Sequence, residues 1–170
     1  MSTLTLQPTR DDMRIAYLAA FAVMIHIFES VIPSPFPGVK PGLANVITIA
    51  TLLIYGWRAA AWVSLLRVLV GSLLIGTFLS PTFAMSLSGA ISSVLILGIC
   101  WRLFGHGLGA VGYSILAALA HMAGQFLLAY LLFIPHPGLL KLLPVFMTLA
   151  LVFGVLSGII AAAMIKRVPS

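Results

Sequence analysis

Very few charged residues interrupt the long apolar stretch between Arg14 and Lys166. Only six are found there, separated by runs of Leu, Ala, Ile and Val: Glu29, Lys40, Arg58, Arg67, Arg102 and Lys141. Over the whole chain 7% of residues are charged and 62% are hydrophobic, whereas soluble domains are about 25% charged and about 45–50% apolar. The sequence is therefore predicted to be an integral membrane protein.

Six segments reach or approach the roughly 20 apolar residues that a helix needs to span the hydrocarbon of a bilayer. Each is bounded by a break that contains Gly or Pro, where a helix should stop. The predicted helices are residues 14–32, 42–55, 59–79, 82–104, 108–134 and 142–165. The second is short, so we expect it to tilt, kink or pack partly against its neighbours instead of facing lipid. The prediction is an all-α integral membrane protein, a six-transmembrane-helix bundle.

The loops are too short to fold separately, so residues 1–170 are predicted to form a single membrane domain, with 1–13 as a polar segment before the first helix. That segment carries Asp11 and Asp12, unlike the basic start of a secretory signal, so we expect a retained first helix. If the N-terminus is cytoplasmic, the inner side holds six basic residues and the outer side only Lys40 and Lys141, which fits the excess of positive charge on cytoplasmic loops. Six helices place both termini on the cytoplasmic side.

Several function classes are disfavoured by composition. The nine Lys and Arg residues are scattered singly and form no phosphate-binding patch, so we expect no nucleic acid partner. Cys100 is the single cysteine, which excludes an intrachain disulfide and a multi-cysteine metal site. Asp11 and Asp12 are the only aspartates, no nucleophile is paired with a base, and no glycine loop ends in Lys-Ser/Thr. We therefore expect no catalysis and no cofactor, and any ATP would be used by a partner.

Arg67 is the most unexpected charge, because it lies about 12 Å along its helix, at about 1.5 Å per residue. A central Arg costs roughly 2.5–3.5 kcal/mol on insertion scales. Backbone carbonyls, Glu29 or a lipid headgroup reached by snorkelling could each satisfy it.

Further polar residues gather toward the predicted outer half. His26 and Glu29 are one turn apart, and His121 and Gln125 form an i, i+4 pair on one face. We expect an outward-opening polar cavity formed by these residues with Asn45, Arg67 and Ser86. His26, Glu29 and His121 make too weak a pattern for a metal site, and none is predicted.

Small residues recur at the spacing that lets membrane helices approach closely. Gly154, Gly158 and Ala162 could pack inside the bundle or pair two copies. Ala16 and Ala20 lie on the first helix, well away from His26 and Glu29, so one face could dock a partner while another faces inward.

Three blocks carry a family resemblance: ESVIPSPFPGVKPGLANVITIATLLIYGWRAA, RVLVGSLLIGTFLSPTFAMSLSGA and GAVGYSILAALAHMAGQ. Together they resemble the membrane family catalogued both as heptaprenyl diphosphate synthase component I and as Gx transporters. That family is similar to the S components of energy-coupling factor transporters. The resemblance implies a bacterial inner membrane location and a first outer loop acting as a lid, with Lys40 and Asn45 as residues that contact the ligand or hold the loop closed. It also implies that Ala16 and Ala20 dock a transmembrane coupling subunit.

Three functions follow as hypotheses. The first is S-component-like capture of a small vitamin or cofactor precursor, energised by separate ATPases and a coupling subunit. The second is a non-catalytic subunit that binds isoprenoid or quinone, in a prenyl diphosphate synthase or an extracytosolic flavin/quinone electron-transfer assembly. The third is a packing protein with no small ligand.

Overall fold

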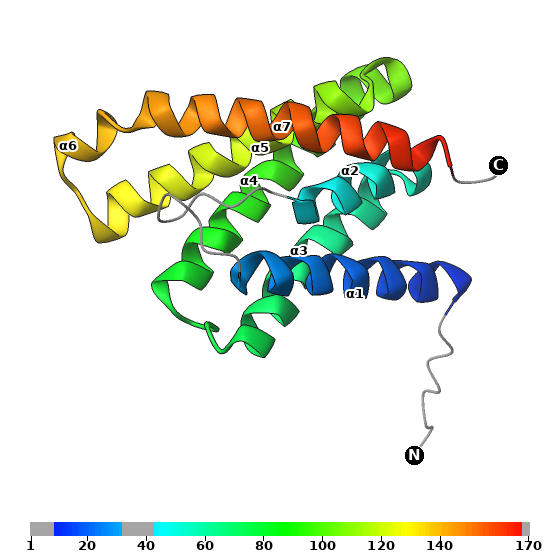
Figure 1. The fold of residues 1–170 in the computed structure, drawn as a ribbon, viewed down its shortest axis with the longest axis horizontal. Coiled ribbons are helices and arrows are strands. Elements are labelled where there is room, and N and C mark those ends of the chain that lie inside the picture. The colour runs from blue at the N-terminus through cyan, green and yellow to red at the C-terminus, as the bar shows by residue number, and fades with distance from the viewer. Residues whose placement is uncertain (1–8, 32–42, 168–170) are drawn as a thin grey trace.

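The computed structural model describes residues 9–31 and 43–167, and this part of the chain is entirely helical apart from short turns. Its longer helices correspond one for one to the six predicted (Figure 1): α1 Arg10–Val31, α2 Leu43–Tyr55, α3 Trp57–Ile75, α4 Pro81–Phe104, α5 Ala110–Leu128 and α7 Leu143–Ile165. The one-turn α6, Pro137–Leu140, and two short helical turns complete the described part: η1 Gly105–Gly107 and η2 Ala129–Phe133. Five helical segments are long and apolar enough to cross a membrane, and α2 is shorter. The all-α membrane bundle is thus confirmed.

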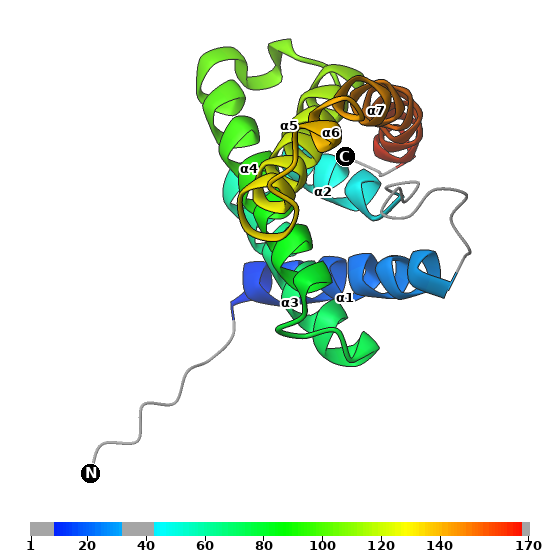
Figure 2. The same ribbon diagram turned by 90° about the vertical axis from the view of Figure 1, so that its left-hand side faces the viewer.

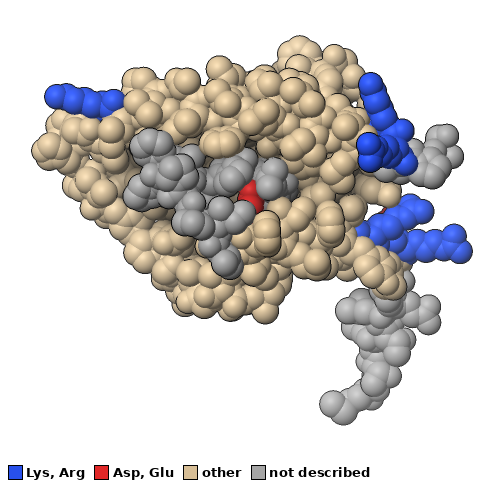
Figure 3. All heavy atoms as spheres, in the orientation of Figure 1, with Lys and Arg blue, Asp and Glu red and all other residues tan. Residues whose placement is uncertain are grey.

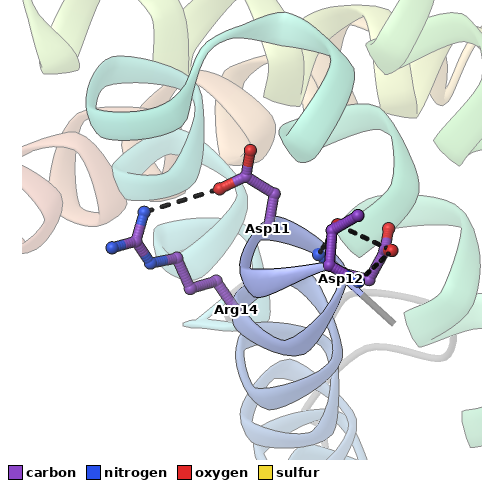
Figure 4. A network of polar contacts seen from close by, with 4 residues as sticks. Asp11, Asp12 and Arg14 are labelled. Carbon is purple, nitrogen blue, oxygen red and sulfur yellow. Dashed lines mark hydrogen bonds and ion pairs between the residues drawn. The ribbon is translucent and has the colours of Figure 1, made fainter. Parts of the chain in front are cut away.

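Helix α1 begins at Arg10, four residues earlier than predicted, because Thr9 caps it. The Thr9 hydroxyl accepts a hydrogen bond from the Asp12 backbone N–H at 3.2 Å, and the Thr9 backbone N–H donates to the Asp12 carboxylate at 2.9 Å. This reciprocal capping box satisfies two amide groups that an uncapped helix leaves unpaired. Arg14 forms a 3.5 Å surface ion pair with Asp11 on the same turn (Figure 4). Polar residues before the apolar run therefore belong to the helix.

Helix α2 is enclosed by the rest of the bundle. It packs against α1, α3, α5 and α7, and Figures 1 and 2 both show it between α1 and α7. Seven consecutive residues from Val46 to Leu52 are buried. Thirteen residues rise about 20 Å, about 10 Å less than the hydrocarbon thickness. Protein contacts take the place of lipid around this short helix, as its length predicted.

The α2–α3 connection is a single residue, Gly56, whose φ of 84° lies in the left-handed region that favours glycine. The two helices therefore form a tight antiparallel hairpin. A second glycine, Gly76 with φ 76°, ends α3 at Ile75, earlier than the predicted residue 79. Helix α5 also departs from the prediction, because its last turn widens into the π-type turn η2 before α6.

Helix α1 begins and α7 ends at the same end of the long axis (Figure 1), and most of the Lys and Arg atoms visible in Figure 3 gather at that end. The α2–α3 and α4–α5 connections lie there too, whereas the α3–α4 and α5–α7 connections lie at the other end. Arg14, near the start of α1, sits 5.8 Å from the ring centre of Tyr55 at the end of α2. We call the end of the bundle where Arg14 and the α2–α3 and α4–α5 connections lie the basic end. Lys141, after α6, is at the opposite end, and Lys40 falls outside the described residues.

The small residues of α7 pack inside the bundle. A Cβ on Gly158 would lie 2.5 Å from the Val111 Cα of α5, and one on Gly154 would lie 3.0 Å from the Ile115 Cα. Ala162 packs against the main core cluster. Of the two roles left open for this stripe, the structure uses it for the α5–α7 contact.

Candidate ligand site

Four of the predicted site residues come together from three helices. His26 and Glu29 lie on α1, Arg67 on α3 and His121 on α5. Arg67 interacts electrostatically with Glu29, and His121 interacts with both Arg67 and His26. Glu29 is 3% exposed and Arg67 7% exposed, so both ionisable side chains are inside the bundle. We call these four residues the polar cluster.

Two glycines make room for the histidine rings. A Cβ on Gly71 of α3 would lie 2.8 Å from Cδ2 of His26, and one on Gly89 of α4 would lie 2.7 Å from Nε2 of His121. Distances below 3.0 Å are not found for real Cβ atoms, so each ring sits directly on a glycine backbone. The sequence did not predict which side chain lies against either glycine. One sequence signal for these contacts was available. Each glycine belongs to a stripe of small residues on a neighbouring helix, at the same depth as the histidine that it contacts.

The contact between α4 and α5 fixes the position of His121. The Ser88 hydroxyl donates a hydrogen bond to the Gly124 carbonyl at 2.9 Å. A Cβ on Gly124 would lie 2.2 Å from the Ser92 hydroxyl oxygen, so α5 approaches α4 at van der Waals distance there. Because Gly124 is three residues after His121, this close approach sets where the imidazole lies.

Some buried polar side-chain atoms have no hydrogen-bond partner among the described residues. Nε of Arg67 and Oγ1 of Thr48 are buried and have no hydrogen-bond partner among the described residues. Unpaired buried polar groups are rare, because each costs about 1–3 kcal/mol. Arg67 therefore retains a donor for a ligand or a water, and its burial rules out the alternative in which it snorkels to the lipid headgroups.

Asn45 is level with Arg67, since the two lie equally far along the chain from the Gly56 turn and both helices rise about 1.5 Å per residue. Ser86 lies about one turn before Gly89 on α4, and Gln125 one turn after His121 on α5. These three side chains are partly exposed and no contact joins them to the polar cluster among the described interactions. Lys40 is outside the described residues.

The side chains of the polar cluster can form both charged and hydrogen-bonded contacts. One carboxylate, one guanidinium and two imidazoles can recognise a polar or ionisable group through charge and hydrogen bonds. Among the described residues no group of three or more His, Cys, Asp or Glu side chains is arranged to hold a metal ion.

The two alanines predicted to dock a partner are on the outside. Ala16 and Ala20 are exposed, and so are the large apolar side chains that surround them on the same face of α1: Met13, Tyr17, Phe21, Met24 and Phe28. Tyr17, Phe21 and Phe28 therefore point away from the polar cluster. This face, which we call the α1 face, consists of apolar groups with small residues at its centre.

Comparison with protein families gives one match. The family model described as heptaprenyl diphosphate synthase component I matches residues 18–164. No curated protein and no solved structure matches the chain. The matched range includes the whole polar cluster and most of the α1 face.

Proposed function

Since the chain belongs to the heptaprenyl diphosphate synthase component I family, whose members resemble S components, we propose that it is a membrane protein that captures a small vitamin or cofactor precursor. The single observation that carries this proposal is the convergence of His26, Glu29, Arg67 and His121 inside an otherwise apolar bundle. Charged groups at membrane depth are costly and are typical of substrate pathways. A protein that only filled space would do better with aliphatic side chains there.

The ligand enters from the outer side in this proposal. The basic end faces the cytoplasm by the positive-inside rule, in the inner membrane of a bacterium. His26 and Glu29 are in the last two turns of α1, away from the basic end. Lys40 and Asn45 would complete the site from the first outer loop and the start of α2, and Ser86 and Gln125 from α4 and α5.

Energy would come from separate subunits, because we expect this chain to be non-catalytic. Ala16 and Ala20 on the exposed α1 face would contact a transmembrane coupling subunit, which would link the chain to ATPases. Small residues at a four-residue spacing let a partner helix approach closely in lipid, where burying apolar surface gains little.

Ligand capture is tested by the small molecules that the purified protein retains. Wild type is expected to carry a polar or ionisable metabolite in near-stoichiometric amount, identified by mass spectrometry after denaturation. Arg67→Met should lose it, because the unpaired guanidinium donor is removed. Arg102→Met, which removes an exposed Arg at the basic end, is the matched control and should retain it. Equal retention by wild type and Arg67→Met would refute the assignment of the polar cluster.

Docking is tested on the α1 face. Ala16→Trp with Ala20→Trp should abolish uptake of the retained ligand in cells and the co-purification of ATPase subunits, while ligand retention stays unchanged. Ala163→Trp places the same bulk on an exposed alanine of α7 and should leave both intact. If uptake survives the double substitution, the proposal that Ala16 and Ala20 contact a coupling subunit is wrong.

A second candidate rests on the description of the family itself. The chain would be a non-catalytic membrane subunit of a prenyl diphosphate synthase, or a partner in flavin/quinone electron transfer, and would bind isoprenoid or quinone. A retained isoprenoid or quinone in the same mass-spectrometry experiment would favour it over vitamin capture.

A further inference from the structure

A hollow separate from the polar cluster lies between α1 and α7 at the basic end, with α2 as its floor. Its cavity volume is about 120 Å³. Eight residues line it, one on α1, five along α2 and two at the end of α7: Leu18, Ile47, Ala50, Thr51, Ile54, Tyr55, Met164 and Ile165. We call it the α1–α7 crevice. Along α2 it runs from Tyr55 to Ile47, a rise of about 12 Å from the basic end toward the middle of the bundle.

The lining of the α1–α7 crevice suits a hydrocarbon chain. Seven of the eight side chains are aliphatic, aromatic or thioether groups. The exception, Thr51, donates its hydroxyl to the Ile47 carbonyl at 2.7 Å, so that donor is used within α2. A polar nutrient would lose its water in this crevice and gain few hydrogen bonds. An acyl chain loses nothing by leaving neighbouring lipid.

The mouth of the crevice is basic. The Arg14 guanidinium carbon lies 5.8 Å from the centre of the Tyr55 ring, and Tyr55 lines the crevice. Lys166 and Arg167 follow directly after Ile165 on the other wall, and both are exposed. The ion pair of Arg14 with Asp11 is long and exposed, and such surface pairs contribute only about 0–1 kcal/mol. Arg14 therefore remains able to bind a phosphate.

We propose that the α1–α7 crevice is a binding site for an anionic phospholipid of the surrounding bilayer. One acyl chain lies against α2 between α1 and α7, and the headgroup phosphate lies among Arg14, Lys166 and Arg167. Charge complementarity carries this choice, because a zwitterionic lipid offers no net charge to a mouth where Arg14, Lys166 and Arg167 outnumber the single nearby carboxylate of Asp11. The occupied crevice links α1 to α7, which both pack on α2. The site is separate from the proposed ligand site and does not depend on it.

The experiment is a lipid titration of the purified protein in neutral detergent, with thermal unfolding as the readout. Phosphatidylglycerol is expected to raise the melting temperature, and phosphatidylcholine with the same acyl chains is not. Arg14→Gln and Lys166→Gln should each weaken phosphatidylglycerol binding about fivefold, since a basic residue near anionic lipid contributes about 1 kcal/mol. Arg102→Gln, at the same end but not at the crevice, should bind like wild type.

The apolar part of the site is tested by filling it. Met164→Trp puts an indole into the crevice from α7 and should weaken phosphatidylglycerol binding about tenfold, which corresponds to about 1.4 kcal/mol. Ile160→Trp, on an exposed position of the same helix outside the crevice, is the matched control. If Met164→Trp does not fold, Ile54→Phe fills the same crevice from α2.

Three results would overturn the proposal. One is equal stabilisation by phosphatidylglycerol and phosphatidylcholine, which indicates non-specific lipid contact. Another is equal binding by Met164→Trp and Ile160→Trp. The third is displacement of phosphatidylglycerol by an equal concentration of farnesyl diphosphate, which would assign the crevice to a prenyl diphosphate instead. The test of the polar cluster uses a different ligand and a different readout, retention of a metabolite detected by mass spectrometry, so failure here is distinguishable from failure of the polar cluster to bind its ligand.

Discussion

At the scale of single residues, the main energetic problem is an arginine inside a membrane bundle. Arg67 is 7% exposed and the nearest acidic partner that interacts with it is Glu29, which is 3% exposed. Breaking a buried charge pair by removing one partner is expensive, because the other charge is left without compensation. The residues of the polar cluster therefore stabilise the fold only when all of them are present together.

A double-mutant cycle tests this coupling. Arg67→Met and Glu29→Gln should each lower the stability of the protein in detergent, and the double variant should lose less than the sum of the two. We expect a coupling energy of about 0.5–3 kcal/mol, as for other residues that belong to one charged network. Reversible unfolding followed by circular dichroism gives the free energy of unfolding of the wild type, the two single variants and the double variant. Strict additivity would mean that the two side chains act independently, and Arg102→Met with Glu29→Gln is the pair expected to be additive.

At the scale of helices, the α5–α7 contact depends on glycines. Gly158→Ala should destabilise the protein by about 1–3 kcal/mol, the usual cost of overpacking, because the new methyl group meets the Val111 Cα of α5 at 2.5 Å. The contact is with the backbone of α5, which cannot move aside as the end of a flexible side chain can. Gly107→Ala is the control, since nothing lies within 4 Å of its added Cβ. Melting temperatures of the two variants check the prediction, and equal values would contradict it.

The helices themselves were largely predictable, because apolar runs and Gly/Pro breaks are local features. The errors at their ends have local causes too. The Thr9–Asp12 capping box could have been read from its spacing, and it moves the start of α1 to Arg10. Gly76 ends α3 early through a left-handed cap, a role that many glycines in the chain do not have.

The site was predictable only in part. His26, Glu29, Arg67 and His121 stood out as polar residues in apolar helices, and the structure brings them together. Which side chains meet depends on how helices rotate against one another, and this is why the sequence did not predict that histidine rings lie against Gly71 and Gly89. The α1–α7 crevice arises from the placement of helices distant in sequence, and no local pattern indicates it.

At the scale of the whole molecule, the distribution of charge predicts an orientation. In a variant with Cys100→Ser, a cysteine placed at Lys141 should react with a membrane-impermeant maleimide added to intact cells. A cysteine placed at Arg102 should react only after permeabilisation. Both positions are exposed, so accessibility to the reagent depends on the side of the membrane alone. The opposite labelling pattern would invert the topology and place the polar cluster toward the cytoplasm.

Because α1 begins and α7 ends at the basic end, affinity tags attached ahead of α1 or behind α7 lead away from the same surface. A sensor chip that holds the protein by such a tag leaves the far surface, beyond the ends of α1 and α3, facing the flowing solution. Soluble compounds can then be screened against that surface without removing the tag, whereas contacts at the tagged surface require a different attachment point, such as Lys141.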